Sequence, residues 1–250
     1  MTKKQRKKLN KTLFILLQVL FILIFIYAGM QLISIFSDYK RASDEYDTLA
    51  EAVVEETPVN ETKEEKEEEE KKQSVLDLPF DYAVPTYEVD LASVKKQNPD
   101  TVGWIILPDS KINYPIVKSK DNTEYLTTTF EGQNAIVYGH NMKNGSMFRA
   151  LNNLTDKEYF WRHHIFCIDT GNGFEEYEII SCYETTEEDL TSWHIGFESQ
   201  DAYAEWLKTV VSRCNYDCAD YDVEKNTITL STCRGASGGP GRFIVHLQKK

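Results

Sequence analysis

Residues 226–247 read NTITLSTCRGASGGPGRFIVHL, and this stretch decides the fold of the C-terminal part of the chain. Residues 227–232 and 242–247 have the β-branched and aromatic side chains typical of strands, and a glycine-rich segment separates them. If the two strands pair as an antiparallel hairpin, Cys233 at the end of the first faces Arg242 at the start of the second. Side chains in such a pair lie roughly 5 Å apart. The sequence therefore predicts a thiol beside a guanidinium group.

A cysteine beside an arginine suits nucleophilic chemistry on a carbonyl group. A thiolate attacks the carbonyl carbon, and a negatively charged oxygen develops as the bond forms. The guanidinium of Arg242 would hold that oxygen or the backbone carbonyls of a substrate. Arginine suits this task better than lysine because its charge does not titrate and its donors form a rigid fork.

A third group must transfer protons, and the chain has five histidines. His140 follows the apolar run 135–138, and loops at strand ends often present catalytic side chains. His246 alternates with expected core residues in the last strand, so we expect a structural role for it. His163 and His164 flank the start of a strand, and we expect surface or capping roles for them. His194 lies in the polar run before the expected long helix. The residues alone leave the choice of His140 open.

Short strand-like runs between turn sequences predict a mostly β domain with accessory helices, arranged as a closed or nearly closed barrel. A short helix is expected over residues 91–97, and a long helix is expected after Ser199, before the strand that ends at Cys233. Apolar side chains recur at helical spacing on one face of the long helix: Tyr203, Trp206, Leu207, Val210, Val211 and Cys214. The remaining strand candidates are residues 102–107, 112–117, 135–138, 164–168 and 177–183.

The N-terminal sequence predicts a membrane anchor. Residues 1–11 hold six of the 28 basic residues and no acidic residue, and residues 12–37 carry no charge. An α-helix over residues 13–36 would be roughly 36 Å long, which is enough to cross a bilayer. A cleaved signal peptide is the alternative, but its apolar region is shorter and ends at a small-residue cleavage site. The positive-inside rule places residues 1–11 in the cytoplasm and everything after the span outside.

Composition divides the rest of the chain into a linker and a globular domain. Between positions 55 and 70 there are nine glutamates and two lysines, so residues 38–74 are expected to be an acidic flexible linker. Residues 75–250 are expected to form the extracellular domain. The net charge of −12 argues against binding of nucleic acid. The five cysteines leave at least one thiol free, and Cys214 and Cys218 lack a partner motif, so neither a metal nor another cofactor is expected.

Three ordered motifs resemble those of the class B sortases, membrane-anchored cysteine transpeptidases of Gram-positive bacteria. They are YGHNM at residues 138–142, TLSTC at residues 229–233 and GRFIVH at residues 241–246. The resemblance covers roughly residues 78–250 and implies an eight-stranded sortase barrel. It also implies that Cys233 is the nucleophile, that His140 transfers protons and that Arg242 stabilises substrate and oxyanion. Ser231, Thr232 and Asn141 correspond to substrate-binding positions.

The resemblance implies a reaction in two steps. The thiolate cleaves a C-terminal sorting motif of a surface protein, and the resulting thioester passes to an amine of a peptidoglycan precursor or cross-bridge. Two features depart from the family pattern. Residues 127–133 are shorter than expected, so one barrel strand would be reduced, and the loop 234–241 is unusually rich in small residues.

Three alternatives are open at this point. An L,D-transpeptidase also pairs cysteine with arginine, but it has histidine and glycine just before the cysteine, where this chain has Leu-Ser-Thr. A non-catalytic extracellular binding module would retain the fold without the reaction. A pilin-polymerising sortase would use a lysine of another protein as the acceptor.

Overall fold

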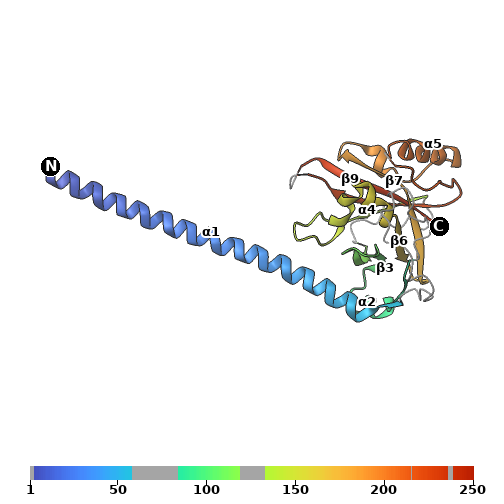
Figure 1. Cartoon of the computed structure of the whole chain (residues 1–250), viewed down its shortest axis with the longest axis horizontal. Helices are drawn as coiled ribbons and strands as arrows, with labels where there is room; N and C mark the ends of the chain where they lie inside the picture. The colour runs from blue at the N-terminus through green and yellow to red at the C-terminus, as the bar shows by residue number, and fades with distance from the viewer. Residues whose placement is uncertain (1–2, 58–83, 119–132, 215, 236–238) are drawn as a thin grey trace, which may run out of the picture. The chain divides into compact units, whose positions relative to one another are not determined.

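The computed structural model describes residues 3–57, 84–118, 133–214, 216–235 and 239–250. The chain divides into two compact units, residues 1–46 and residues 47–250. Helix α1 (Lys3–Val53) begins in the first unit, where it is the long helix of Figure 1. Its large apolar side chains between Phe14 and Phe36 are exposed. Within the described part of the chain, this is the one helix long and apolar enough to span a membrane.

The second unit is built on a curled seven-stranded sheet in the order β4-β3-β6-β7-β9-β8-β5 (Figure 1). Neighbouring strands are antiparallel except β5 and β8, which are parallel. The strand bounds are β3 (Thr101–Ile106), β4 (Asn113–Val117), β5 (Asn134–Tyr138), β6 (Ile165–Asp169), β7 (Phe174–Thr186), β8 (Thr227–Cys233) and β9 (Gly241–Lys249).

The predicted mostly β architecture and its strands are confirmed. The sheet is a half-barrel of seven strands in the described ranges, rather than a closed eight-stranded barrel, because no pairing of β4 with β5 closes it there. Most of the shortened segment 127–133, where a reduced strand was expected, lies outside the described residues.

The two predicted helices are also confirmed. Helix α2 (Leu91–Gln97) begins at Asp90, and helix α5 (Gln200–Val211) begins at Ser199, whose hydroxyl accepts a hydrogen bond from the backbone N–H of Ala202. The predicted apolar face of α5 packs on side chains of β7 and β9 through Tyr203, Trp206, Leu207, Val210 and Val211. Cys214, which the sequence placed on the same stripe, lies just beyond the end of the helix.

Three short helices were not predicted from the sequence. The 3-10 helix η3 (Phe148–Thr155) and helix α4 (Lys157–Arg162) connect β5 to β6. The 3-10 helix η4 (Leu190–Trp193) lies between β7 and α5. Both 3-10 helices contact β8 near Cys233: Asn152 of η3 donates to the carbonyl of Cys233, and Trp193 of η4 donates to Ser231.

The end of α1 packs onto the sheet domain, although the sequence suggested a linker there. Ala50 and Val53 are buried in a cluster that includes Trp104, and strand β1 (Val54–Thr57) pairs with β2 (Thr86–Val89). Apolar side chains at positions 49, 50, 53 and 54 supply this contact just before the acidic run begins. Residues 58–74 of the expected linker lie outside the described residues.

Candidate active site

The hairpin of β8 and β9 has the predicted register, with Cys233 directly opposite Arg242. Cys233 is exposed at the end of its strand. Just beyond it, the backbone N–H of Arg234 donates to the carbonyl of Gly241 at 2.8 Å. A Cβ atom at position 241 would lie 2.5 Å from the carbonyl oxygen of Arg234, so only glycine permits this close approach. The glycine therefore helps to set the thiol against the guanidinium.

Arg242 is held in one orientation by three acceptors. Its Nη1 donates to the carbonyl oxygens of Gly239 at 2.9 Å and Gly241 at 2.8 Å. Its Nη2 forms an ion pair with Glu187 Oε2 at 2.5 Å. The guanidinium is therefore held by two neighbouring backbone carbonyls and by the carboxylate of Glu187, which follows β7. Its remaining N–H donors are left for a ligand.

His140 lies two residues after the end of β5, in a loop that is bound to β8 on both sides of the histidine. The backbone N–H of Gly139 donates to the carbonyl of Ser231 at 3.1 Å. The side-chain Nδ2 of Asn141 donates to the carbonyl of Cys233 at 2.8 Å. These two hydrogen bonds hold the exposed His140 beside the end of β8.

Packing also fixes this loop. A Cβ atom at Gly139 would lie 2.3 Å from the ring of Phe148, so the ring uses the space that glycine leaves. The backbone N–H of Phe148 donates to the carbonyl of His140 at 2.9 Å. On the far side, Arg149 Nη1 donates to Asn141 Oδ1 at 2.9 Å. The first turn of η3 therefore positions the loop that carries the histidine.

The strand registers bring the three predicted catalytic residues to one end of the sheet. Tyr138 on β5 lies opposite Ser231 on β8, and Cys233 lies opposite Arg242 on β9. Cys233 and Arg242 therefore lie side by side across the hairpin, and the loop after β5 that carries His140 is hydrogen-bonded to the end of β8.

Two of the predicted substrate-binding residues are buried in this structure. Ser231 is buried, and its hydroxyl accepts a hydrogen bond from Trp193 Nε1 at 3.2 Å. Thr232 is also buried, and its hydroxyl has no hydrogen-bond partner among the described residues. Asn141 is half-buried and bonded to the carbonyl of Cys233. A substrate-binding role for these three residues stays a prediction.

The carbonyl of Cys233 has a second donor in the buried residue Asn152 of η3, at 3.4 Å from its Nδ2. Arg234 Nη1 donates to both oxygens of Asn152 at 3.1 Å, and Arg234 Nη2 forms an ion pair with Glu184 at 2.7 Å. This network fastens the backbone of the cysteine to η3 and β7. The thiol is thus carried by an anchored strand end.

The remaining histidines have structural environments. His246 is fully buried on β9, between Tyr183 and Thr229, with 2.9 Å from its ring nitrogens to each hydroxyl. Burial is the main cause that lowers its pKa to about 3, with Arg213 as a further cause. His163 caps α4, as its sequence position suggested. Among the described residues no group of three or more histidine, cysteine or acidic side chains is arranged to hold a metal ion.

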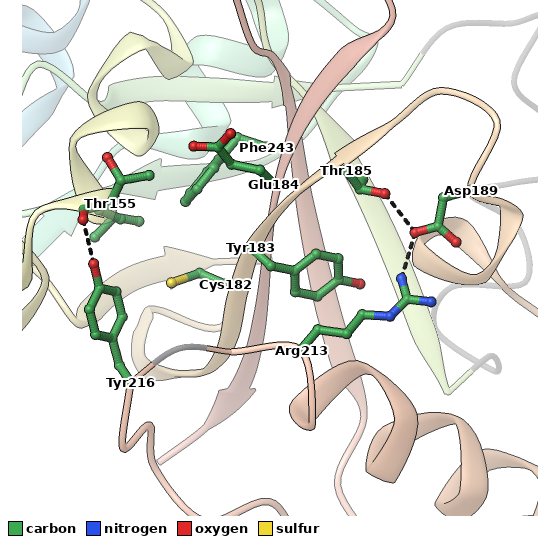
Figure 2. A pocket seen from close by; sticks show the side chains of 10 residues that line it. Thr155, Cys182, Tyr183, Glu184, Thr185, Asp189, Arg213, Tyr216 and Phe243 are labelled. Carbon is green, nitrogen blue, oxygen red and sulfur yellow. Dashed lines mark hydrogen bonds and ion pairs between the residues drawn. The ribbon is translucent and has the colours of Figure 1, made fainter.

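A cavity of about 670 Å³ lies beside β7 (Figure 2). An ion pair of 2.5 Å between Arg213 and Asp189 closes one side of it, and Thr185 also donates to Asp189. On the other side, the Tyr216 hydroxyl donates to the carbonyl of Thr155. Cys233, His140 and Arg242 are not among its lining residues. The group of these three residues at the end of β8, and not this cavity, is the candidate active site.

Sequence reasoning missed several residues of the site. Glu187 was not singled out, because one glutamate in the run 184–188 carries no distinguishing signal. Trp193 and Asn152 lie on short 3-10 helices that the hydrophobic pattern did not predict. The TLSTC and GHNM motifs singled out the predicted central residues, whereas the residues that support them lie in segments distant in the chain.

Several known proteins are similar to this chain. Residues 105–250 match the family model described as the sortase domain. The chain is 34% identical over 165 residues to sortase B of Listeria monocytogenes, covering 58% of this chain and 67% of that protein. It is 25% identical over 259 residues to sortase B of Staphylococcus aureus, covering 94% and 95%. The crystal structure of the Staphylococcus aureus protein superposes with a TM-score of 0.56 at 28% identity, covering 64% of this chain and 86% of that one.

Proposed function

Because the chain belongs to the sortase family, with sortase B proteins as its relatives, and is therefore a cysteine transpeptidase, we propose that Cys233, His140 and Arg242 are its catalytic residues. The observation that carries this proposal is the pairing of Cys233 directly opposite Arg242, together with the hydrogen bonds that hold the loop of His140 against the end of β8. Hydrogen bonds to other elements hold the backbone of Cys233, the guanidinium of Arg242 and the loop of His140, which supports a joint role for the three residues.

In the first half-reaction the thiolate of Cys233 attacks the carbonyl carbon of the scissile peptide bond. The developing oxyanion accepts hydrogen bonds from the guanidinium of Arg242, which lies across the hairpin. The carbon–nitrogen bond then breaks, and the protonated imidazole of His140 donates a proton to the leaving amine. The products are a thioester on Cys233 and a free amine.

In the second half-reaction an acceptor amine attacks the thioester carbonyl. His140, now neutral, removes a proton from the attacking nitrogen. The carbon–sulfur bond breaks, a new amide bond forms and the Cys233 thiolate is regenerated. Because one imidazole both gives and takes the proton, its exposed position in a loop fixed to β8 suits exchange of one amine for another.

The substrate is proposed to be a C-terminal sorting motif of a surface protein, and the acceptor a peptidoglycan amine. Two solved relatives support these classes by their bound ligands. One is a Staphylococcus aureus sortase B–substrate complex, 28% identical to this chain, and the other is a sortase B complexed with triglycine, 27% identical. The amino group of triglycine has the chemistry of the proposed acceptor.

The N-terminal helix is proposed to be a single-pass anchor with residues 1–11 in the cytoplasm and the catalytic domain outside the cell. One helix that begins near the N-terminus has the length and composition of a membrane span. The basic residues precede it and acidic residues follow it, which is the orientation of the positive-inside rule. A domain outside the membrane would meet both surface proteins and cell-wall amines there.

A transfer assay tests the function directly. The full chain in detergent is incubated with a panel of sorting-motif peptides and triglycine, and products are identified by mass spectrometry. The proposal predicts a peptide cleaved within its motif and joined to triglycine. Cys233→Ala should form no product, whereas the exposed-site control Lys143→Ala should retain turnover. Product formation by Cys233→Ala, or none by the wild-type chain with any peptide of the panel, would contradict the proposal.

A further inference from the structure

Three cysteines outside the proposed active site meet beside β7. Cys182 is buried on that strand, while Cys214 and Cys218 are half-buried in the segment after α5. The side chain of Cys182 is hydrogen-bonded to both of the others, and those two are hydrogen-bonded to each other. The backbone N–H of Cys182 also donates to Cys214 Sγ at 3.4 Å. Thiols 32 residues apart in the chain are therefore direct neighbours.

This cluster is accessible to a small reagent. Cys182 lines the cavity of about 670 Å³, and its sulfur points toward Tyr216 on the opposite side of that cavity (Figure 2). Cys214 is itself partly exposed. Cys167, which is as buried on β6 as Cys182 is on β7, is hydrogen-bonded to none of the three clustered thiols in the interactions described. The three clustered thiols are therefore distinct from a cysteine that serves only as a core side chain.

The hydrogen bonds within the cluster shift the pKa values of Cys182 and Cys214 in opposite directions. Those from Cys182 and Cys218 lower the pKa of Cys214 well below its ordinary value. The pKa of Cys182 is raised, chiefly through its hydrogen bond to Cys214. Among the three thiols the cluster favours the thiolate form of Cys214, and a thiolate is the form that attacks a disulfide.

We propose that Cys182 and Cys214 form a disulfide by exchange with a low-molecular-weight disulfide. The Cys214 thiolate attacks one sulfur of the reagent, whose S–S bond breaks and releases one small thiolate. Cys182 then gives its proton to a base in solution, and its sulfur attacks Cys214 in the mixed disulfide, releasing the second small thiolate. Two protein thiols are oxidised and one small disulfide is reduced to two thiols. Cys218 keeps its proton and stays reduced.

The bond would restrain the segment that supports the proposed active site. The loop between the two cysteines contains Glu187, which binds Arg242, and Trp193, which donates to Ser231. Closing such a loop reduces the conformational freedom of the unfolded chain. The modification should therefore raise stability, whether or not Cys233 is a nucleophile.

Disulfide mapping tests the proposal in the full chain with Cys233→Ala, because that change removes the exposed thiol. The chain is treated with oxidised glutathione, alkylated, digested and examined by mass spectrometry. We expect a peptide pair linked through Cys182 and Cys214, and a rise in the unfolding midpoint of roughly 10 °C. Adding Cys218→Ser should leave the link in place. Adding both Cys182→Ser and Cys218→Ser should stop the reaction at a glutathione adduct on Cys214.

The controls of the disulfide mapping, and the results that would contradict the proposal, do not depend on the outcome of the transfer assay. Cys167→Ser, outside the cluster, should give the same linked pair as its parent. Complete alkylation of both Cys182 and Cys214 after the treatment would overturn the proposal, as would a link between Cys214 and Cys218 in their place. Because Cys233 is absent throughout, neither result depends on whether the chain is a transpeptidase.

Discussion

The partners of Arg242 account for the choice of arginine at this position. Two backbone carbonyls and the carboxylate of Glu187 accept hydrogen bonds from the two terminal nitrogens of the planar guanidinium. The remaining N–H donors of Arg242 therefore have a fixed direction. An ammonium group cannot satisfy these acceptors and a substrate oxygen in the same geometry. We expect Arg242→Lys to lower kcat/KM in the transfer assay by about 10²- to 10³-fold. Lys249→Arg, on the same strand, is the control and should be near normal; equal rates for both variants would show that the arginine is only structural.

His246 gives a residue-level prediction about pH. The pKa of His246 is about 3 in the folded protein, against an ordinary value of 6.5 in the unfolded chain. Between these two pH values the unfolded chain therefore binds a proton at His246 that the folded chain does not. Stability therefore falls as pH decreases from 6.5 toward 3, by up to about 1.4 kcal/mol per pH unit. Urea unfolding at pH values of about 6.5, 5.5 and 4.5 should show a shallower dependence for His246→Gln. Parallel curves for the two proteins would mean that His246 is not the group responsible.

At the scale of elements, the connection between β5 and η3 is what brings the histidine to the cysteine. Asn141 fastens this connection to the carbonyl of Cys233 and accepts a hydrogen bond from Arg149. Asn141→Ala should lower turnover roughly 3- to 10-fold, because this factor corresponds to the net free energy that one such hydrogen bond contributes. Lys143→Ala, in the same loop but exposed, should have no effect. Unchanged turnover in both variants would remove Asn141 from the support of His140.

Local sequence patterns predicted the elements that form from residues close together in the chain. The hairpin of β8 and β9 was predicted with its register, because alternation and a glycine-rich connection specify a two-stranded unit. The face of α5 was predicted because one stripe of apolar residues meets the sheet. The pairing of β7 with β9 and the parallel pairing of β5 with β8 are set by tertiary packing. For that reason the sequence alone did not identify Glu187 as the partner of Arg242, or Asn141 as a donor to Cys233.

For the whole molecule, the structure assigns the residues just before the acidic run to the core. Ala50 and Val53 are 7% and 8% exposed, and β1 adds a strand pair with β2. Burial of one valine side chain contributes about 1.5–3 kcal/mol. A chain that begins at Asp47 should therefore unfold at a temperature roughly 5–10 °C higher than one that begins at residue 75. Equal unfolding midpoints would show that residues 47–57 add no stability to the domain.

The central claim is that the sulfur of Cys233 becomes covalently bound to the acyl part of the substrate. The most direct measurement is the intact mass of the full chain after brief mixing with a sorting-motif peptide without an amine acceptor, followed by acid quenching and peptide mapping. We expect a mass increase equal to the N-terminal cleavage fragment, located on Cys233 and removed by hydroxylamine, as is typical of a thioester. An adduct on any other residue, or cleavage of the peptide with Cys233 unmodified at every time point, would contradict it.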